Sequence, residues 1–343
     1  MARHPPVAVP PPPGAPHIRS MMNPVPRLDA SGACPRRGRV VVDAKKVLWF
    51  GGHGVVGLSG LWAIQPGALV AGAVLTWLLV LLGHSVGYHR LLMHGNFKTS
   101  KPLGRLLILC GALLGAAGPS AIIRVHDERD WAQRAPEAEG GCHPYFSQHN
   151  GFWRDMLWQL FCRLELDHPP RQSPDATWGA NPFVRHLDQW WRVWALAPAV
   201  PLWAAFGWAG VAWGVSARIL AINAGHWAVN HLCHHPRLGV RLWEVPANGV
   251  QANDLLRAGP VSGALAGLLT AGECWHANHH AFPESANTGL GRWQWDPGYC
   301  LLKALERVGL VWDVREARGE GLRGAVVRMG AVGVGVSQRG CRH

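Results

Sequence analysis

The sequence predicts an all-α integral membrane protein with about four transmembrane helices and a cytoplasmic helical cap that holds a metal site. Charged residues make up only 16% of the 343 residues, whereas apolar residues make up 48% and tryptophans number 19. This composition is typical of membrane proteins with aromatic side chains at the membrane surfaces. Uncharged runs of nearly bilayer-spanning length alternate with polar segments in which histidines gather.

The charge pattern excludes one large class of partner. The net charge is +12, but the Lys and Arg residues are scattered and accompany no helix-turn-helix, zinc-finger or RNP-like motif. We therefore expect no nucleic-acid partner. The eight cysteines form no CxxC pair, a pattern that favours reduced thiols on a cytoplasmic face over disulfides or a structural zinc site.

Both ends of the chain differ in composition from the middle. Residues 1–45 are predicted to form a disordered arm, because residues 5–13 are almost all proline and valine and an Arg-rich stretch follows. Residues 46–318 are predicted to be the membrane domain. The Gly/Arg-rich residues 319–343 have little to bury and are predicted to be a flexible tail.

Two pairs of apolar segments are predicted to form helical hairpins. The first pair is 47–64 and 68–83, with a turn at Gln65-Pro66-Gly67. The second pair is 190–206 and 207–227, and it contains Arg218, which needs a partner or a path to the membrane surface. A buried hairpin of a soluble protein is the alternative.

Other segments are predicted to stay on one side of the membrane. Residues 103–123 are rich in Gly and Ala and are expected to be buried or to lie at the interface rather than to cross. Residues 297–310 are expected to form an amphipathic helix.

Positive charge orients these crossings. Eight Lys and Arg residues precede residue 47 and eleven lie between residues 90 and 187, whereas the turns near residues 65 and 208 have none. Positive residues accumulate on cytoplasmic loops. We therefore expect both ends and all the histidine clusters to face the cytoplasm.

The strongest chemical signal is the segment that contains His276, His279 and His280. These positions are i, i+3 and i+4, so a helix would place all three imidazoles on one face. Imidazole binds zinc, copper, iron and nickel, and the spacing therefore suggests metal binding. The alternative is a polar helix face that is merely rich in histidine.

Three further clusters lie at the same predicted membrane face. His89 and His94 are five residues apart, so they can converge only if the helix ends or widens between them. His126 and Asp130 can share a helix face, and so can Asn230 and His234. His143 and His149 could add imidazoles through a loop. The total is about twice the three or four ligands that one zinc-type site uses, so two metal ions are the economical interpretation.

Three motifs together resemble the membrane-bound fatty-acyl desaturases, the histidine-box di-iron family that includes the stearoyl-CoA desaturases. Residues 87–94, GYHRLLMH, match the HRxxxH box of that family. Residues 275–283, WHANHHAFP, resemble its HNxHHxFP box, with Ala277 in place of Asn. Residues 227–234, WAVNHLCH, match its WxxNxxxH segment, in which the histidine binds iron and the asparagine lies beside the metal. The resemblance covers residues 45–315.

This resemblance implies a bacterial-type enzyme that introduces a cis, Δ9-like double bond into a fatty acyl chain with two iron ions and O₂. It implies a fatty acyl thioester or a lipid as substrate and a separate electron donor, either a ferredoxin or a cytochrome b5-type protein with its reductase. It places the enzyme in the bacterial inner membrane with the active site facing the cytoplasm. No catalytic residue beyond the metal centre is expected. The candidate metal-site residues are His89, His94, His126, Asp130, His143, Asn230, His234, His276, His279 and His280.

The middle box departs from the family pattern. The family has HxxHH, and this chain has His126, then Arg129 and Asp130 at the other two positions. A protonated Arg cannot bind a metal, whereas a carboxylate can. We expect Asp130 to replace one histidine and His143 or His149 to replace the other. The rival interpretation is an inactive desaturase-like protein with a damaged second iron site.

Two further functions remain open at this point. A hydroxylase or another oxygenase could use the same scaffold and add oxygen instead of removing hydrogen. A haem-b electron-transfer protein could use His53 and His84 as axial ligands. We expect His53, His84 and His226 to be satisfied core histidines or neighbours of ligands, and His231 and His235 to lie at the surface.

Overall fold

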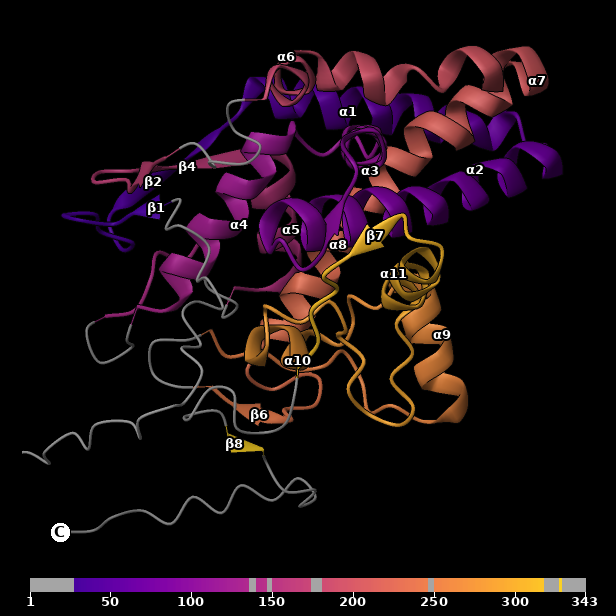
Figure 1. Cartoon of the computed structure of the whole chain (residues 1–343). Helices are drawn as coiled ribbons and strands as arrows, with labels where there is room; N and C mark the ends of the chain where they lie inside the picture. Colours follow the sequence, from indigo (N-terminus) through magenta and orange to yellow (C-terminus); the bar gives the residue numbers. More distant parts are fainter. Residues whose placement is uncertain are drawn as a thin grey trace, which may run out of the picture.

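The computed structural model describes residues 28–135, 140–146, 150–173, 181–245, 250–317 and 327–328. As predicted, these residues are mostly helical (Figure 1). Long helices extend together at one end of the molecule, and the shorter helices that follow residue 250 lie together below them in the view of Figure 1.

The first apolar pair forms two helices joined by a tight reversal. Helix α1 (Ala44–Ser59) continues as the short 3-10 helix η1 (Gly60–Trp62), and α2 (Pro66–Leu79) continues as η2 (Val80–Met93), which is wound as a π-helix. The Asp43 carboxylate caps α1 by accepting from the Lys45 and Lys46 amides at 2.9 and 3.2 Å. Pro66 opens α2, where its missing N–H costs nothing. The turn therefore falls where the sequence predicts it.

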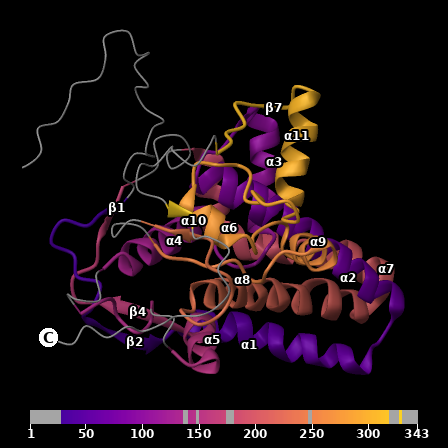
Figure 2. The same ribbon diagram turned by 90° about the horizontal axis from the view of Figure 1, so that it is seen from below.

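The second apolar pair also reverses direction. Helix α6 (Pro182–Leu196) leads into α7 (Ala199–Val211), the π-helical η4 (Ala212–Ala217) and α8 (Arg218–His234). Gly207 breaks α7 with φ 57° and ψ −142°, a conformation that residues with a side chain rarely adopt. The predicted boundary between residues 206 and 207 therefore coincides with the break. Figure 2 shows α8 running alongside α1, with α5 (Phe152–Phe161) near one end of both.

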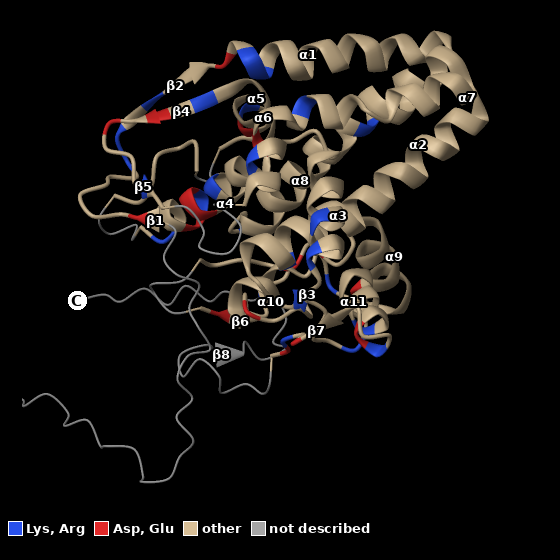
Figure 3. Cartoon of the chain, turned by 45° about the horizontal axis from the view of Figure 1, so that its top comes forward, with Lys and Arg blue, Asp and Glu red and all other residues tan. Residues whose placement is uncertain are grey.

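Two helical stretches among the described residues are long and apolar enough to cross a bilayer. They are Pro66–Met93, with 28 residues and a mean hydropathy of 2.0, and Pro182–His234, with 53 residues and a mean hydropathy of 1.4. Figure 3 shows no Lys, Arg, Asp or Glu on the far ends of α1, α2 and α7. Val55, Val70 and Val200 in these helices are exposed. An uncharged outer surface with exposed apolar side chains suits contact with lipid.

Arg218 finds its partners inside the helical bundle. Only 1% of the residue is exposed, and its guanidinium donates to the carbonyl oxygens of Gly214 at 2.8 Å, Leu113 at 2.5 Å and Ala195 at 3.0 Å. Leu113 ends α3 and Ala195 lies in the last turn of α6. The positive charge therefore lies against the negative ends of two helices, which stabilises it without a carboxylate partner.

The segment predicted over residues 103–123 is divided into two helices. Helix α3 (Lys101–Ala112) packs closely on η2, and α4 (Pro119–Gln133) begins after a bend. Pro119 stands at the start of α4, where it cannot continue a preceding helix. The largest core cluster joins η2, α3, α6 and α11, and it includes Val86, Ile108, Leu187 and Leu302.

The last part of the chain packs against the C-terminal ends of η2 and α8. It contains α9 (Pro260–Thr270), the six-residue α10 (His276–Ala281) and α11 (Pro297–Arg307). The amphipathic helix predicted over residues 297–310 corresponds to α11. Asp296 caps it by accepting from the Tyr299 amide at 2.9 Å.

Short antiparallel strand pairs tie distant segments together. They are β1 (Leu28–Asp29) with β5 (Arg171–Gln172), β2 (Gly38–Val42) with β4 (Cys162–Leu166), β3 (Lys98–Thr99) with β7 (Val311–Trp312), and β6 (Trp243–Glu244) with β8 (Val327–Arg328).

These pairs change the predicted boundary of the N-terminal arm. Residues 38–42, expected within the disordered arm 1–45, form a strand whose register runs from Gly38 opposite Leu166 to Val42 opposite Cys162. The arm was predicted from its proline content, but the residues after Arg37 contain a run of valines that pairs with β4. Residues 1–27 lie outside the described residues, as does the predicted tail 319–343 except for Val327 and Arg328.

Candidate metal centre

Four histidines from three helices and one helix end converge on one point. They are His89 in η2, His94 at its end, His126 in α4 and His279 in α10, and one ring nitrogen of each lies within 4.8 Å of the others. We call this set the first group. The His89 and His279 Nε2 atoms are 3.2 Å apart.

Three more histidines form a second group. They are His234 at the end of α8 and His276 and His280 in α10, and their nearest ring nitrogens also lie within 4.8 Å of one another. The ring centroids of His279 and His280 are 5.1 Å apart. The two groups are therefore adjacent, and α10 contributes to both.

The short helix α10 explains how one motif serves two groups. His276 and His280 are one turn apart and their ring centroids are 4.6 Å apart, whereas His279 turns to the first group. Asp254 accepts from the Ala277 amide at 3.0 Å, and Trp243 donates to the Asn278 side chain at 2.7 Å. These contacts hold two successive residues of α10. Burial raises the pKa of Asp254 to about 7.

The π-helical winding of η2 brings His89 and His94 together. In a regular α-helix, residues five apart point about 140° away from each other. Here the His94 amide donates to the His89 carbonyl at 3.1 Å, an i to i−5 bond that marks the wider helix. The two ring centroids are 4.9 Å apart. The sequence analysis required the helix to end or to widen between these two residues, and in the structure it widens.

Buried polar groups hold the outer nitrogens of these rings. The Glu273 carboxylate lies 2.7 Å from His89 Nδ1, and the Gln251 carbonyl oxygen lies 3.0 Å from His234 Nδ1. Such contacts fix the ring orientation and the position of its hydrogen. Burial alone would raise the pKa of Glu273, but His89 and Arg90 bring it well below its ordinary value.

Arg90 in turn fixes Glu273. Its guanidinium is buried, contacts Glu273 at 3.3 Å and makes a two-point contact with Asp296 at 2.9 and 2.8 Å. Its Nε donates to the Ala286 carbonyl at 2.7 Å. Residues 87–94 are thus bound to the chain around α10 and α11 through one buried ionic network.

The arrangement of ring nitrogens fits a bound cation. His276 Nε2 lies 3.0 Å from His234 Nε2 and 3.1 Å from His280 Nε2. A neutral ring nitrogen can donate one hydrogen or accept one, so it cannot donate to both neighbours. Because His234 Nδ1 faces a carbonyl oxygen, it carries the hydrogen, and the Nε2 lone pair faces His276. A metal ion such as iron would satisfy these facing lone pairs.

The protonation of the rings agrees with this fit. Burial lowers the pKa of His276, His279 and His280 well below the ordinary value for histidine. The rings are therefore neutral near pH 7, which is the form that binds a metal. Asn230, one turn before His234, has a buried side-chain oxygen with no hydrogen-bond partner among the described residues. That oxygen is available to a ligand beside the second group.

The structure does not bring Asp130 or His143 into either group. The Asp130 carboxylate lies 3.5 Å from the Arg134 guanidinium. His143 accepts from the Tyr145 amide at 3.1 Å, and its own amide donates to Pro35. His149 lies outside the described residues. The expected replacements for the missing histidines are therefore not found among the converging side chains.

For two other histidines, the structure confirms one prediction and contradicts the other. His53 contacts the Ser216 hydroxyl at 3.0 Å and is a satisfied core residue, as predicted. His231 was expected at the surface, but only 3% of it is exposed and its Nδ1 lies 2.7 Å from Asp155. The burial has a physical reason: α5 covers this side of α8 and supplies a carboxylate.

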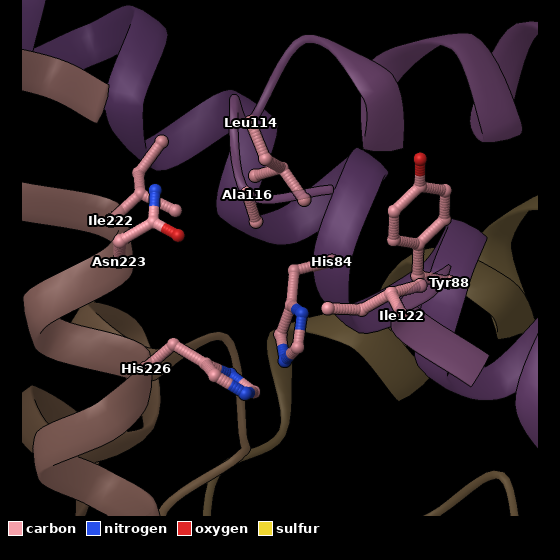
Figure 4. A pocket seen from close by; sticks show the side chains of 8 residues that line it. All are labelled: His84, Tyr88, Leu114, Ala116, Ile122, Ile222, Asn223 and His226. Atoms are coloured by element: carbon pink, nitrogen blue, oxygen red, sulfur yellow. The ribbon is translucent and has the colours of Figure 1, made fainter. Parts of the chain in front are cut away.

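A small, mostly apolar cavity adjoins the first group. His84 and His226 turn toward each other across it beneath Leu114 and Ala116 (Figure 4). The His84 and His226 ring centroids are 4.5 Å apart, and His84 stacks on His89 at 6.0 Å. His84 and His53 are the two residues considered as haem ligands. They lie beside different side chains: His84 contacts His89 and His226, whereas His53 contacts Ser216.

Comparison with known proteins gives one family. The family model described as fatty acid desaturase matches residues 59–296. The sn-2 palmitoyl-lipid 9-desaturase of Nostoc sp. (strain 36) is 29% identical over 278 residues, which cover 80% of this chain and 91% of that protein. The sn-1 stearoyl-lipid 9-desaturase of Anabaena variabilis is 29% identical over 256 residues, which cover 75% of this chain and 85% of that protein. The hex-5-enoyl-[acyl-carrier protein] acetylenase of Moorena producens (strain JHB) is 28% identical over 278 residues, covering 76% and 81%.

Proposed function

Since the chain belongs to the fatty acid desaturase family and is thus an oxidoreductase that acts on fatty acyl chains, we propose that it introduces a cis double bond at the Δ9 position. The oxidant is O₂, and two iron ions are the cofactor. Relatives that act at this position on palmitoyl and stearoyl lipids support the choice of Δ9.

One observation carries this proposal. Seven imidazoles from distant parts of the chain lie in two adjacent groups, and the outer nitrogens of His89 and His234 face buried oxygens. His89, His94, His126 and His279 would hold one iron, and His234, His276 and His280 would hold the other, with Asn230 beside it. Asp130 and His143 are left out of this ligand set.

Desaturation removes hydrogen from unactivated carbon atoms, which no acidic or basic side chain can do. The bound iron would supply the capacity to activate O₂ for that step. The chain supplies the rest: Glu273 and Arg90 keep the His89 ring oriented, and α10 sets the two groups side by side. The buried surroundings of η2 and α10 exclude bulk water from the centre.

The reaction sets the partners. The substrate carbon pair gives O₂ two hydrogens, and a further two electrons and two protons are needed to form two water molecules. We propose a separate donor for these electrons, either a ferredoxin or a cytochrome b5-type protein with its reductase. The acyl substrate is a lipid ester or a thioester, since the similar proteins include enzymes of both kinds.

The proposed location is the inner membrane of a bacterium, with α1, α2, residues 190–206 and residues 207–227 as four crossings. The charge-free ends of α1, α2 and α7 support this arrangement. The positive residues before residue 47 and between residues 90 and 187 support a cytoplasmic position for the histidine groups and for the helices that cover them.

Product analysis tests the function. The gene is expressed in a host that cannot make unsaturated fatty acids, and the lipids are analysed by mass. A desaturase gives acyl chains that have lost two hydrogens, whereas a hydroxylase gives chains that have gained one oxygen. Unchanged lipids, obtained with an iron-loaded protein and a working electron donor, would overturn the proposal.

A further inference from the structure

A buried carboxylate outside every histidine motif contacts the helix that carries His234. Asp155 in α5 is 3% exposed. Its Oδ2 accepts from Trp227 Nε1 at 2.8 Å and lies 2.7 Å from His231 Nδ1, and its Oδ1 accepts from the Gln159 side chain at 3.3 Å. A buried carboxylate is stable only with such partners. Both partners on Oδ2 belong to α8.

Further contacts hold both ends of α5 in place. The Lys46 ammonium donates to the carbonyl oxygens of Gln159 and Cys162 at 3.0 and 2.7 Å, which caps the end of α5. The Tyr145 hydroxyl also donates to Cys162 at 3.2 Å. Phe152 packs on the Trp227 and His231 rings, with centroids 4.6 and 5.6 Å away. Asp155 therefore projects from a fixed support onto α8.

The contact sets the rotation of α8 about its own axis. Trp227, His231 and His234 fall within about 60° of one another around an α-helix, so all three share one side of α8. A ring nitrogen lies about 6 Å from the helix axis, and a 20° rotation would move it by about 2 Å. Metal–ligand distances tolerate only about 0.2 Å. A small rotation of α8 would thus remove His234 from the second group.

The two groups depend on α8 to different degrees. The second group takes His234 from α8 and its other members from α10, whereas the first group takes no residue from α8. We infer that Asp155 is a positioning residue for the second group, which it completes by fixing His234 through Trp227 and His231. This inference rests on the proposed function, because it assigns one of the two proposed iron positions to the control of Asp155.

Iron content of the purified full-length chain tests the inference. The unchanged chain should hold about two iron ions and Asp155→Ala about one, because only the second group loses a ligand. Asp155→Asn keeps an oxygen that can accept from Trp227, so it should retain more iron than Asp155→Ala. Gln159→Ala is the matched control, since it removes a contact to the same carboxylate without touching α8, and it should keep both ions.

Double variants assign the lost ion to one group. Asp155→Ala added to His234→Ala should lower the iron content no further, whereas Asp155→Ala added to His94→Ala should remove the remaining ion. Two retained ions in Asp155→Ala would overturn the inference, as would loss of both ions from Asp155→Ala and Asp155→Asn alike. A failure of the proposed function is distinct, since the unchanged chain would then lack two ions.

Discussion

His279 and its neighbours in α10 differ in the group they serve. His279 is the residue that α10 gives to the first group, while His276 and His280 belong to the second. All three rings are neutral, because burial lowers the pKa of each well below the ordinary value for histidine. Loss of one ring should therefore weaken metal binding mainly at one of the two groups.

We predict that His279→Ala holds about one iron ion instead of about two and forms no unsaturated product, because the first group loses the ligand that α10 gives it and binds its ion less tightly. Iron per chain and lipid composition are the measurements. His168→Ala is the control, since His168 is exposed and lies in neither group. Unchanged iron and unchanged product in His279→Ala would exclude His279 as a ligand.

At the scale of single residues, the sequence predicts the converging histidines better than it predicts the residues that contact them. The spacing of His276, His279 and His280 is enough to predict a metal site. Glu273 and Asp155 carry no such signal, because their partners are distant in the chain and come together only when η2 and α8 are packed. Asp130 was predicted as a ligand from its position in a motif, but in the structure it faces Arg134.

Among the helices, η2, which carries His89, packs closely on α3. Gly83 and Gly87 in η2 face the backbone of α3, where an added Cβ would meet the carbonyl oxygens of Cys110 and Leu107. Only glycine permits this approach.

We predict that Gly87→Ala pushes η2 away from α3 and lowers the free energy of unfolding by about 1–3 kcal/mol, the usual cost of overpacking. The iron content should fall as well, since both η2 histidines belong to the first group. Thermal unfolding and iron analysis are the measurements. In Gly51→Ala, the matched control in α1, the new Cβ meets nothing within 4 Å, so neither quantity should fall. Equal behaviour of the two variants would count against the close contact.

The helices were largely predictable, whereas the strands were not. Apolar runs and the Gln65-Pro66-Gly67 turn predict α1, α2 and the pair around Gly207, because local composition decides where such helices begin and end. The strand Gly38–Val42 depends on pairing with Cys162–Leu166, and a short segment carries little evidence of so distant a partner. The division of residues 103–123 at Pro119 was missed, although a proline marks the new helix.

Over the whole molecule, the uncharged ends of α1, α2 and α7 lie away from α10, the helix that contributes to both histidine groups (Figure 3). We predict that Trp62→Cys, at the exposed turn after α1, reacts with a membrane-impermeant thiol reagent in intact cells. The exposed native Cys300 should react only after the membrane is opened. The buried Cys274 is the internal control and should not react in the folded protein. Labelling of both exposed positions from the same side would contradict the proposed orientation.

Six residues of α10 carry members of both histidine groups. The distance between the two proposed ions is therefore governed by covalent bonds and one helical turn rather than by the meeting of remote helices. If the helices of the bundle move apart, the histidines outside α10 should leave the ions before the distance between the ions changes. The pair of ions would then be lost one at a time and would not drift apart while both remain bound.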